Sequence, residues 1–539
     1  MRGINCRANR EEMEKLQKIA RLYRTIRHLK LVQISNRLKR KVFHHKINTS
    51  PAPNISNLAN IEWRFIGRPQ SYLGKDRFVF LNREESIVFP QGWNDKNLQK
   101  LWLYNLHYFE GLLDDKASAE LKNYIIQQWI DQNPPVAGNG WEPYPTSLRI
   151  VNWIKWALSG NKLSSEANQS LATQVRHLCG NIEYHLLGNH LFVNAKALVY
   201  AGLYFDGEEA QGWYRRGIEI LIEQIPEQFL SDGAHFELST TYHALLTEDL
   251  LDILQYMKNA GKEISPSWVN KAQSAVNWLR VMTRPDGFPP LFNDAAYGIT
   301  PSLEDIFSLA NFIGIESQEQ LEAGMIDLPA SGYFRYSTDD YSVFGDAGQI
   351  GPEYIPGHAH CDMLNFELFA HGVPVIVDTG TSTYEVGERR QIERGTASHN
   401  TVQIGNEEQS EIWGAFRVAR RAKLIDRTIN SNSAVAEYVG YKSREMTHRR
   451  QFLFENKVIV IEDQINQEGL AVARIHLHPD VAVILYDQIA EAGKVRIQFL
   501  GAETIDLKDY EYAPEFNKKL IAKVLEITFK HRLTTKINL

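Results

Sequence analysis

The chain has 539 residues, of which 43% are hydrophobic, 11% aromatic and 23% charged. This is ordinary globular composition, so it excludes collagen-like, disordered and coiled-coil proteins. The three cysteines lie far apart, which excludes a disulfide framework and a close pair of metal ligands. No apolar run approaches the ~20 residues that span a bilayer. We therefore expect a soluble protein of several folding units.

The net charge of −6 is divided unevenly along the chain. Through Lys46 there are 14 Lys and Arg against 3 Asp and Glu, a net charge of +11, and the remainder carries −17. Residues 21–46 interleave basic and apolar side chains at roughly helical spacing, which fits an anionic membrane surface, nucleic acid, or a solvated helix packed on the body. We expect no nucleic-acid partner, and peripheral membrane contact through residues 1–46.

No uninterrupted apolar segment typical of a secretory signal occurs near the start. The sequence therefore predicts a cytoplasmic or membrane-surface location, with the periplasm as the alternative.

The first half of the chain carries helical periodicity. A loop rich in Pro, Asn and Ser ends the basic arm at about residue 60, and a short lead-in with strands is expected over residues 61–95. Gly, Pro and Asn punctuate the segments that follow, which favours antiparallel helical hairpins with chemistry in the loops. The segments predicted as helices are 101–113, 117–132, 145–158, 165–187, 194–203, 211–225, 240–259 and 267–283.

After Gly332 the periodicity shortens toward two, which predicts an antiparallel β-sandwich of about 200 residues. The predicted strands are 341–344, 364–369, 373–377, 434–439, 457–462, 474–477, 495–499 and 522–529. The fold class is therefore multidomain α+β, with a basic arm and linker (1–60), a helical domain (61–330) and a β-sandwich (331–539). No glycine-rich phosphate-binding motif occurs, so we expect no nucleotide cofactor.

Two histidines and an aspartate stand out in the second half. His358 and His360 lie in Gly-His-Ala-His-Cys-Asp, and Asp378 closes an apolar run. On a strand, the two histidines would point to the same face. With a carboxylate from a neighbouring strand they would form a reasonable zinc site, although hydrogen-bonded core residues are the alternative.

A second group of polar and aromatic residues lies in the helical half. Asn189 and His190 stand at an expected helix boundary, and Asp-Gly-Ala-His-Phe-Glu precedes Tyr242. Aromatic side chains beside polar ones suit a sugar-binding cleft, whereas aromatic residues at helical spacing are also typical of a core.

The motifs GHAHCDMLNFEL, VDTGTSTYE and RGTASHNTV resemble the heparinase II/III-like polysaccharide lyases, and the resemblance covers about residues 101–421. It implies an (α/α) toroid followed by a β-sandwich, and cleavage of a uronate-containing acidic polysaccharide by β-elimination. In that reaction the substrate carboxylate must be neutralised before the adjacent proton can leave. By resemblance, Asn189 and His190 supply this neutralisation.

The same resemblance assigns the proton transfers and a metal. Tyr242 serves as the acid to the leaving oxygen, and also as the base if nearby positive charge lowers its pKa from about 10. His358 is the candidate base for substrates with the opposite stereochemistry at the acidic carbon. A largely structural divalent metal, zinc by expectation, would be held by His360, Asp378 and His399. The residues expected to bind substrate, with a packing role as the alternative for each, are His107, Glu142, Tyr144, Arg149, Asn194, Glu237, His243, Tyr384 and Arg394.

The acidic body of the protein argues against heparin itself as the substrate, since a charge of −17 repels a strongly sulfated polymer. A uronate polymer of bacterial capsule or exopolysaccharide metabolism is the better expectation. One alternative is a glycoside hydrolase, which needs two carboxylates across the cleft, from Glu142, Glu237, Asp286 and Asp294. Another is a non-catalytic carbohydrate-binding or assembly protein.

Overall fold

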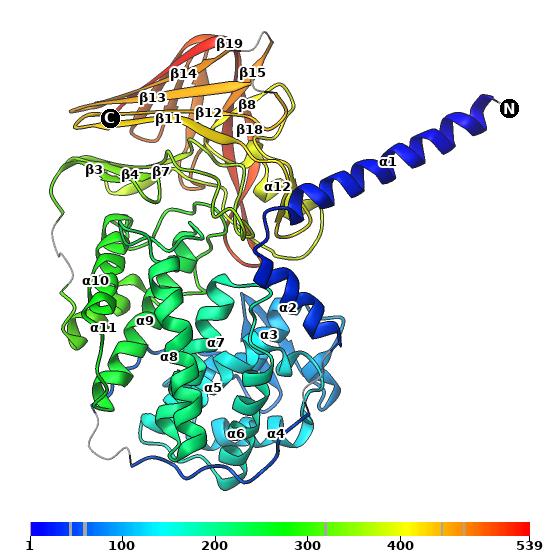
Figure 1. The fold of residues 1–539 in the computed structure, drawn as a ribbon. Helices are drawn as coiled ribbons and strands as arrows, with labels where there is room; N and C mark the ends of the chain where they lie inside the picture. The colour runs from blue at the N-terminus through cyan, green and yellow to red at the C-terminus, as the bar shows by residue number, and fades with distance from the viewer. Residues whose placement is uncertain (1, 43–45, 58–61, 317–320, 444–445, 467–468) are drawn as a thin grey trace.

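The computed structural model describes residues 2–42, 46–57, 62–316, 321–443, 446–466 and 469–539, and only the backbone of residues 2–12 and 14. Figure 1 shows a helical domain built from the first half of the chain and, stacked on it, the β-sheets of the second half. The predicted order of a helical domain followed by an antiparallel β-sandwich is confirmed.

Each of the predicted helical segments overlaps an observed helix, and two further α-helices of the described residues, α11 and α12 (Glu388–Arg394), had no predicted counterpart. The central helix α7 is buried along almost its whole length and packs against α5 and α8. Of these two neighbours, α8 is amphipathic, with one side in the core and the other toward solvent, whereas α5 has no exposed residue. The helices are α3 (Lys100–Tyr108), α4 (Ala119–Gln132), α5 (Pro143–Leu158), α6 (Ser165–Gly180), α7 (Gly188–Tyr204), α8 (Glu208–Gln228), α9 (Thr240–Asn259), α10 (Pro266–Val281) and α11 (Leu303–Ile313).

The connection between α6 and α7 differs from the prediction. The expected helix 165–187 ends at Gly180, and α7 begins at Gly188 rather than at residue 194. Leu187 and Gly188 have φ of 68° and 56°, so the chain reverses there. A Cβ at position 188 would collide with the Glu237 carboxylate, which explains the glycine. The early start of α7 places Asn189 and His190 in its first turn.

The sheet nearer the helical domain has five antiparallel strands in chain order. They are β3 (Gly324–Leu328), β4 (Tyr333–Ser337), β5 (Tyr341–Asp346), β6 (Phe366–Ala370) and β7 (Val373–Ile376). Because β3 pairs with β4 along its length, the β-domain begins before the expected boundary at residue 331.

The second sheet has the strand order β11-β12-β13-β14-β19-β18-β17-β16, and β15 bridges β19 to β8. Along β13 and β14 buried and exposed residues alternate, as expected for a sheet with one face in the core. Its strands are β8 (Val402–Ile404), β11 (Lys423–Asn430), β12 (Ser433–Val439), β13 (Thr447–Glu455), β14 (Val458–Ile465), β15 (Ala471–His476), β16 (Val483–Tyr486), β17 (Ile489–Ala492), β18 (Val495–Glu515) and β19 (Lys518–Asn538). A short pair, β9 (Ile412–Trp413) and β10 (Arg417–Val418), lies outside it.

A small apolar cluster joins the helical domain to the five-stranded sheet. The Trp278 ring of α10 lies 5.8 Å from the Tyr333 ring of β4, and Phe292 stacks on the same tyrosine at 5.5 Å. All three side chains are buried. The cluster holds the two domains together beside the loops that carry the candidate functional residues.

His358 and His360 do not lie on a strand, so the expectation that one strand presents both on a common face is wrong. Residues 357–362 form a turn and loop between β5 and β6. The backbone N–H groups of His360 and Cys361 are satisfied by Asn293 and Arg394, which are distant in sequence, rather than by a neighbouring strand. The direction of each histidine is therefore set by tertiary contacts.

The basic N-terminal segment forms two helices, α1 (Arg2–Ile26) and α2 (Leu31–Val42), as its periodicity predicts. The expected lead-in is the hairpin of β1 (Arg77–Phe80) and β2 (Arg83–Ser86). Residues 43–45 of the predicted arm and 58–60 of the linker lie outside the described residues. In the part of the chain that the structure describes, no helix combines the length and apolar character needed to cross a membrane.

Candidate active site

The predicted catalytic residues Tyr242 and His358 meet where the loops of the β-sandwich touch the start of α9. Their ring centroids lie 3.8 Å apart with an interplanar angle of 31°. The hydroxyl of Tyr384 donates to that of Tyr242 over 3.4 Å. Residues from the two domains therefore converge on one point.

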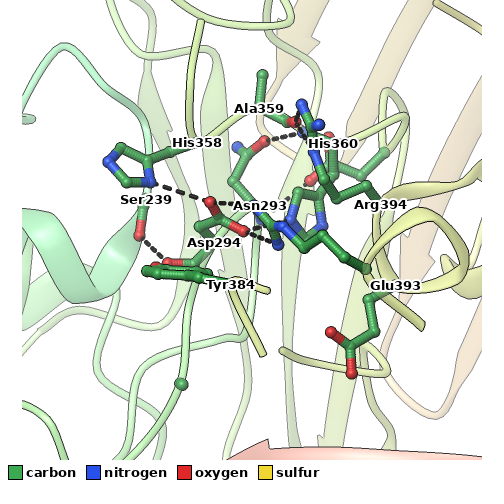
Figure 2. Close-up of polar contacts among 12 residues, drawn as sticks. Ser239, Asn293, Asp294, His358, Ala359, His360, Tyr384, Glu393 and Arg394 are labelled. Atoms are coloured by element: carbon green, nitrogen blue, oxygen red, sulfur yellow. Dashed lines mark hydrogen bonds and ion pairs between the residues drawn. The ribbon is translucent and has the colours of Figure 1, made fainter. Parts of the chain in front are cut away.

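The carboxylate of Asp294 contacts the ring of His358 (Figure 2). This carboxylate lies 3.0 Å from Nδ1 of His358 and 2.7 Å from Nε2 of His360. The two terminal nitrogens of Arg390, on α12 (Glu388–Arg394), donate to it over 2.5 and 2.6 Å. Burial alone would raise the pKa of Asp294, but Arg390 and the two histidines hold that pKa well below its usual value. Asp294 is therefore an ionised anchor.

The anchoring role of Asp294 and the contribution of Arg390 were missed by the sequence analysis, which considered Asp294 only as a hydrolase carboxylate. A carboxylate two positions after the apolar pair Leu291 and Phe292 was an available signal, since buried acids need partners. No comparable signal marked Arg390.

Glu237 connects the start of α7 to the other side of His358. The carboxylate accepts hydrogen bonds from the backbone N–H and the side-chain amide of Asn189, over 2.9 to 3.1 Å. Its second oxygen lies 3.2 Å from Nε2 of His358. Both ring nitrogens of His358 therefore face a carboxylate, and the predicted neutralising residue Asn189 lies one side chain away.

His190 follows Asn189 in the first turn of α7. Its Nδ1 lies 3.2 Å from the carboxylate of Glu183, and its ring lies 4.5 Å from that of Tyr144. Burial lowers the pKa of His190, but Glu183 and, more weakly, Glu237 outweigh it and raise that pKa above its usual value. Asn194 does not face a ligand: it holds Glu183 through the backbone N–H and the carboxylate. His190 therefore carries positive charge more readily than an ordinary histidine.

The structure corrects the expectation about the charge state of Tyr242. The proposed base role required nearby positive charge to lower its pKa. Instead, burial and then Tyr384, Asp294 and Glu237 raise the pKa of Tyr242 well above 10. In the free protein its hydroxyl is therefore protonated, which suits the acid role.

Four residues predicted to bind substrate have packing roles instead. All four are buried, and their polar atoms are engaged by protein groups. His107 bonds the Trp93 carbonyl and the Trp129 indole, and His243 bonds the Ala275 carbonyl and the His235 N–H. Arg149 lies over the Trp129 ring and bonds Gln174 and the His107 carbonyl, and Arg394 bonds the carbonyls of Ala359 and Gly414. These four side chains are therefore part of the packed interior.

Glu142 and Tyr144, which were expected to bind substrate, are both partly exposed. Glu142 pairs with Lys100 at 3.1 Å and accepts a short hydrogen bond from Tyr104. Tyr144 packs its ring between His190 and Tyr108. A tyrosine-rich wall beside polar groups can stack on sugar rings and orient their hydroxyls.

The expected metal ligands His360, Asp378 and His399 are all fully buried and close together. Nδ1 of His399 lies 2.7 Å from the carboxylate of Asp378, and the rings of His360 and His399 lie 5.3 Å apart. Nδ1 of His360 and Nε2 of His399 are buried without a hydrogen-bond partner. Within the described residues, however, no three His, Cys, Asp or Glu side chains are arranged around a common point. Two imidazoles and a carboxylate are donors that zinc accepts. In this structure, however, His399 and Asp378 are joined by a hydrogen bond.

Comparison with known families decides the relationship. The model of the heparinase II/III N-terminus matches residues 119–310, and that of the heparinase II/III-like C-terminal domain matches residues 321–539. The chain belongs to the heparinase II/III-like family. The first match ends within α11 and the second begins just before β3, where the helical domain gives way to the first strand of the sandwich.

This heparinase II/III-like protein is 26% identical over 361 residues to a heparin-sulfate lyase of Bacteroides stercoris, covering 60% of the chain and 52% of that relative. It is 23% identical over 484 residues to the heparin-sulfate lyase of Pedobacter heparinus, covering 80% and 71%. The chain thus spans about half the length of the first of these relatives. A solved structure of heparinase III superimposes with a TM-score of 0.70 at 17% identity, over 94% of this chain and 89% of the other, and shows the common fold.

Proposed function

We propose that the protein is a polysaccharide lyase that cleaves a uronate-containing acidic polysaccharide by β-elimination. The observation that carries this proposal is the contact between Tyr242 and His358, with Asn189 joined to His358 through Glu237. The residues that we propose as acid, base and carboxylate-neutralising amide thus lie close together. The heparin-sulfate lyases among its relatives support the same reaction.

Each residue has a role that follows from its surroundings. Asn189 and the readily protonated His190 bind the uronate carboxylate, which makes the neighbouring C–H bond acidic. Asp294 holds Nδ1 of His358, so Nε2 is the ring atom that takes this proton, and the Glu237 carboxylate 3.2 Å from Nε2 then stabilises the positive charge of the ring. The electrons of the C–H bond form the new double bond as the bond to the leaving glycosidic oxygen breaks. Tyr242 gives its hydroxyl proton to that oxygen.

The surroundings of the carboxylates favour elimination over hydrolysis. A hydrolase needs one carboxyl group that carries a proton and a second that faces the substrate. Asp294 is buried and held ionised by Arg390, and Asp286 is paired with Arg284. A purely binding protein would have no use for the close pair of Tyr242 and His358.

We propose a weakly sulfated uronate polymer, of bacterial capsule or exopolysaccharide metabolism, as the substrate. Two cations beside the site are already paired, Lys100 with Glu142 and Arg390 with Asp294. Sulfate groups are bound best by unpaired arginines in bidentate contacts. The charge of −17 beyond Lys46 also disfavours a highly sulfated chain.

We further propose that His360, Asp378 and His399 hold a structural zinc ion. Two imidazoles and a carboxylate are donors that zinc accepts, and two buried ring nitrogens are otherwise without partners. When bound, the ion would stabilise the loop that carries His358. None of the proton transfers described above depends on it.

Ultraviolet absorbance of the unsaturated product tests the proposed reaction. The protein would be incubated with heparan sulfate, heparin, hyaluronan, chondroitin, alginate and bacterial exopolysaccharides. We expect an increase in absorbance with at least one polymer, abolished in Tyr242→Phe and retained in Tyr486→Phe, which alters an exposed tyrosine of the sandwich. New reducing ends without absorbance would establish hydrolysis instead. Binding without any cleavage would favour the non-catalytic alternative.

A further inference from the structure

The helix α2 contacts the helical domain through its polar side. Gln33 is buried and donates to the Leu186 carbonyl over 3.2 Å. On the same side, Arg37 and Arg40 donate to the carbonyls of His185 and Asn181 over 3.3 and 3.2 Å. These three bonds attach α2 to the loop that leads into Asn189 and His190.

The opposite side of α2 is an apolar stripe that faces solvent. Leu31, Ile34, Leu38 and Val42 follow helical spacing and share one face, and they are 84%, 40%, 62% and 70% exposed. A helix that packs on its own domain normally buries such a stripe. In α2 the apolar stripe faces solvent instead. Packing of the helix on the body therefore explains the contacts of its polar side but not the exposed apolar side.

The second half of α1 repeats this arrangement. Arg24 pairs with Glu411 at 3.2 Å, the Trp413 indole donates to the hydroxyl of Thr25, and Arg21 lies over the same indole. On the other side the apolar side chains are exposed, and Figure 1 shows α1 projecting away from the body. These exposed side chains are Leu16, Ile19, Tyr23 and Ile26.

We propose that α1 and α2 bind flat on an anionic lipid surface, with their apolar stripes in the headgroup region. Exposed lysines accompany both stripes, Lys15 and Lys18 on α1 and Lys39 and Lys41 on α2. A strongly basic helix with one exposed apolar face is the type that lies in the plane of a membrane interface. Neither helix is long and apolar enough to cross the bilayer.

Charge favours lipid over a second copy of this chain as the occupant. Pairing the stripes of two copies would bring together two segments that each carry a net charge of +11. An anionic bilayer offers an apolar layer and negative headgroups in the same place, and each basic residue near such a surface strengthens binding. The apolar and basic features of the segment are then both satisfied.

Sedimentation of the full chain with lipid vesicles tests this inference. We expect binding to mixed phosphatidylglycerol and phosphatidylcholine vesicles, and weak binding to phosphatidylcholine alone. The double variant Leu31→Ser and Leu38→Ser should lose roughly tenfold or more in affinity. Lys39→Gln with Lys41→Gln should lose about tenfold at low salt. Ile484→Ser with Ile521→Ser, two exposed apolar residues of the sandwich, is the matched control and should bind as the parent does.

Thermal unfolding monitored by circular dichroism would establish that each variant is folded, and the readout needs no polysaccharide substrate. The inference is overturned if the parent chain does not sediment with the anionic vesicles. It is equally overturned if the Leu31 and Leu38 variant binds like the parent. A parent dimer that this variant converts to a monomer, without lipid binding, would assign the stripes to self-association.

Discussion

Nδ1 of His358 lies 3.0 Å from the carboxylate of Asp294, and that carboxylate is itself gripped by both terminal nitrogens of Arg390. This relationship makes the orientation of a proposed catalytic base depend on a buried ion pair. The pair lies at the junction of the domains, because Asp294 follows α10 and Arg390 belongs to α12.

Asp294→Asn should therefore reduce activity by at least about a hundredfold, since the amide cannot fix the proton on Nδ1 of His358. The substitution also leaves Arg390 buried without its counter-charge, which should cost about 3–5 kcal/mol of unfolding free energy. Ultraviolet assays well below the unfolding temperature, together with urea denaturation, measure the two effects. Asp286→Asn, at the partly exposed Arg284 pair, is the control. Full activity in folded Asp294→Asn would contradict the anchoring role.

Glu183 should control the titration of His190. We expect NMR to show a pKa for His190 above its ordinary 6.5, and Glu183→Gln should lower it, because the carboxylate outweighs the effect of burial. The ion pair of Glu183 and His190 stabilises the fold fully below about pH 6.5, the pKa of an ordinary histidine. This stabilisation is lost as the pH rises through the raised pKa of His190. On the acid side it is lost as the pH falls through the pKa of Glu183, which is itself lowered. An unchanged His190 titration in Glu183→Gln would refute the pairing.

Substitution of Arg149 should lower the free energy of unfolding much more than substitution of Lys100. Arg149→Met removes a buried guanidinium bonded to Gln174 and the His107 carbonyl, and should cost about 2–4 kcal/mol of unfolding free energy. Lys100→Met removes an exposed partner of Glu142 at the cleft edge and should cost less than about 1 kcal/mol. Chemical denaturation compares them. A stable Arg149→Met protein with an increased KM would restore the cleft-lining role predicted from sequence.

Metal analysis should find stoichiometric zinc in the purified protein, and EDTA should lower its Tm. His399→Gln should abolish the bound zinc, because it removes a proposed ligand. His448→Gln alters another buried histidine paired with an aspartate, Asp463, and should leave the zinc content unchanged. Protein purified without metal, whose Tm is unaffected by zinc and by EDTA, would rule the site out.

A helical first half and a strand-rich second half could be predicted from sequence patterns alone. The apolar pattern predicted α9 over residues 240–259, which are its observed bounds. The helix begins there because the side chain of Ser239 accepts a hydrogen bond from the backbone N–H of Tyr242. The resemblance to the heparinase II/III-like family singled out Asn189, His190, Tyr242 and His358, which lie at the domain junction. Periodicity and capping are local properties, so a single sequence carries them directly.

The tertiary structure alone decided which groups touch and which are accessible. Asp294 is 64 positions from His358 and 96 from Arg390, so no local pattern could pair them. His107 and Arg149 have the residue types of a binding cleft, yet packing buries them. The outward direction of the apolar stripe on α2 likewise depends on three hydrogen bonds to a loop about 150 residues away. Contacts between distant segments, and the burial they create, exist only once the chain has folded.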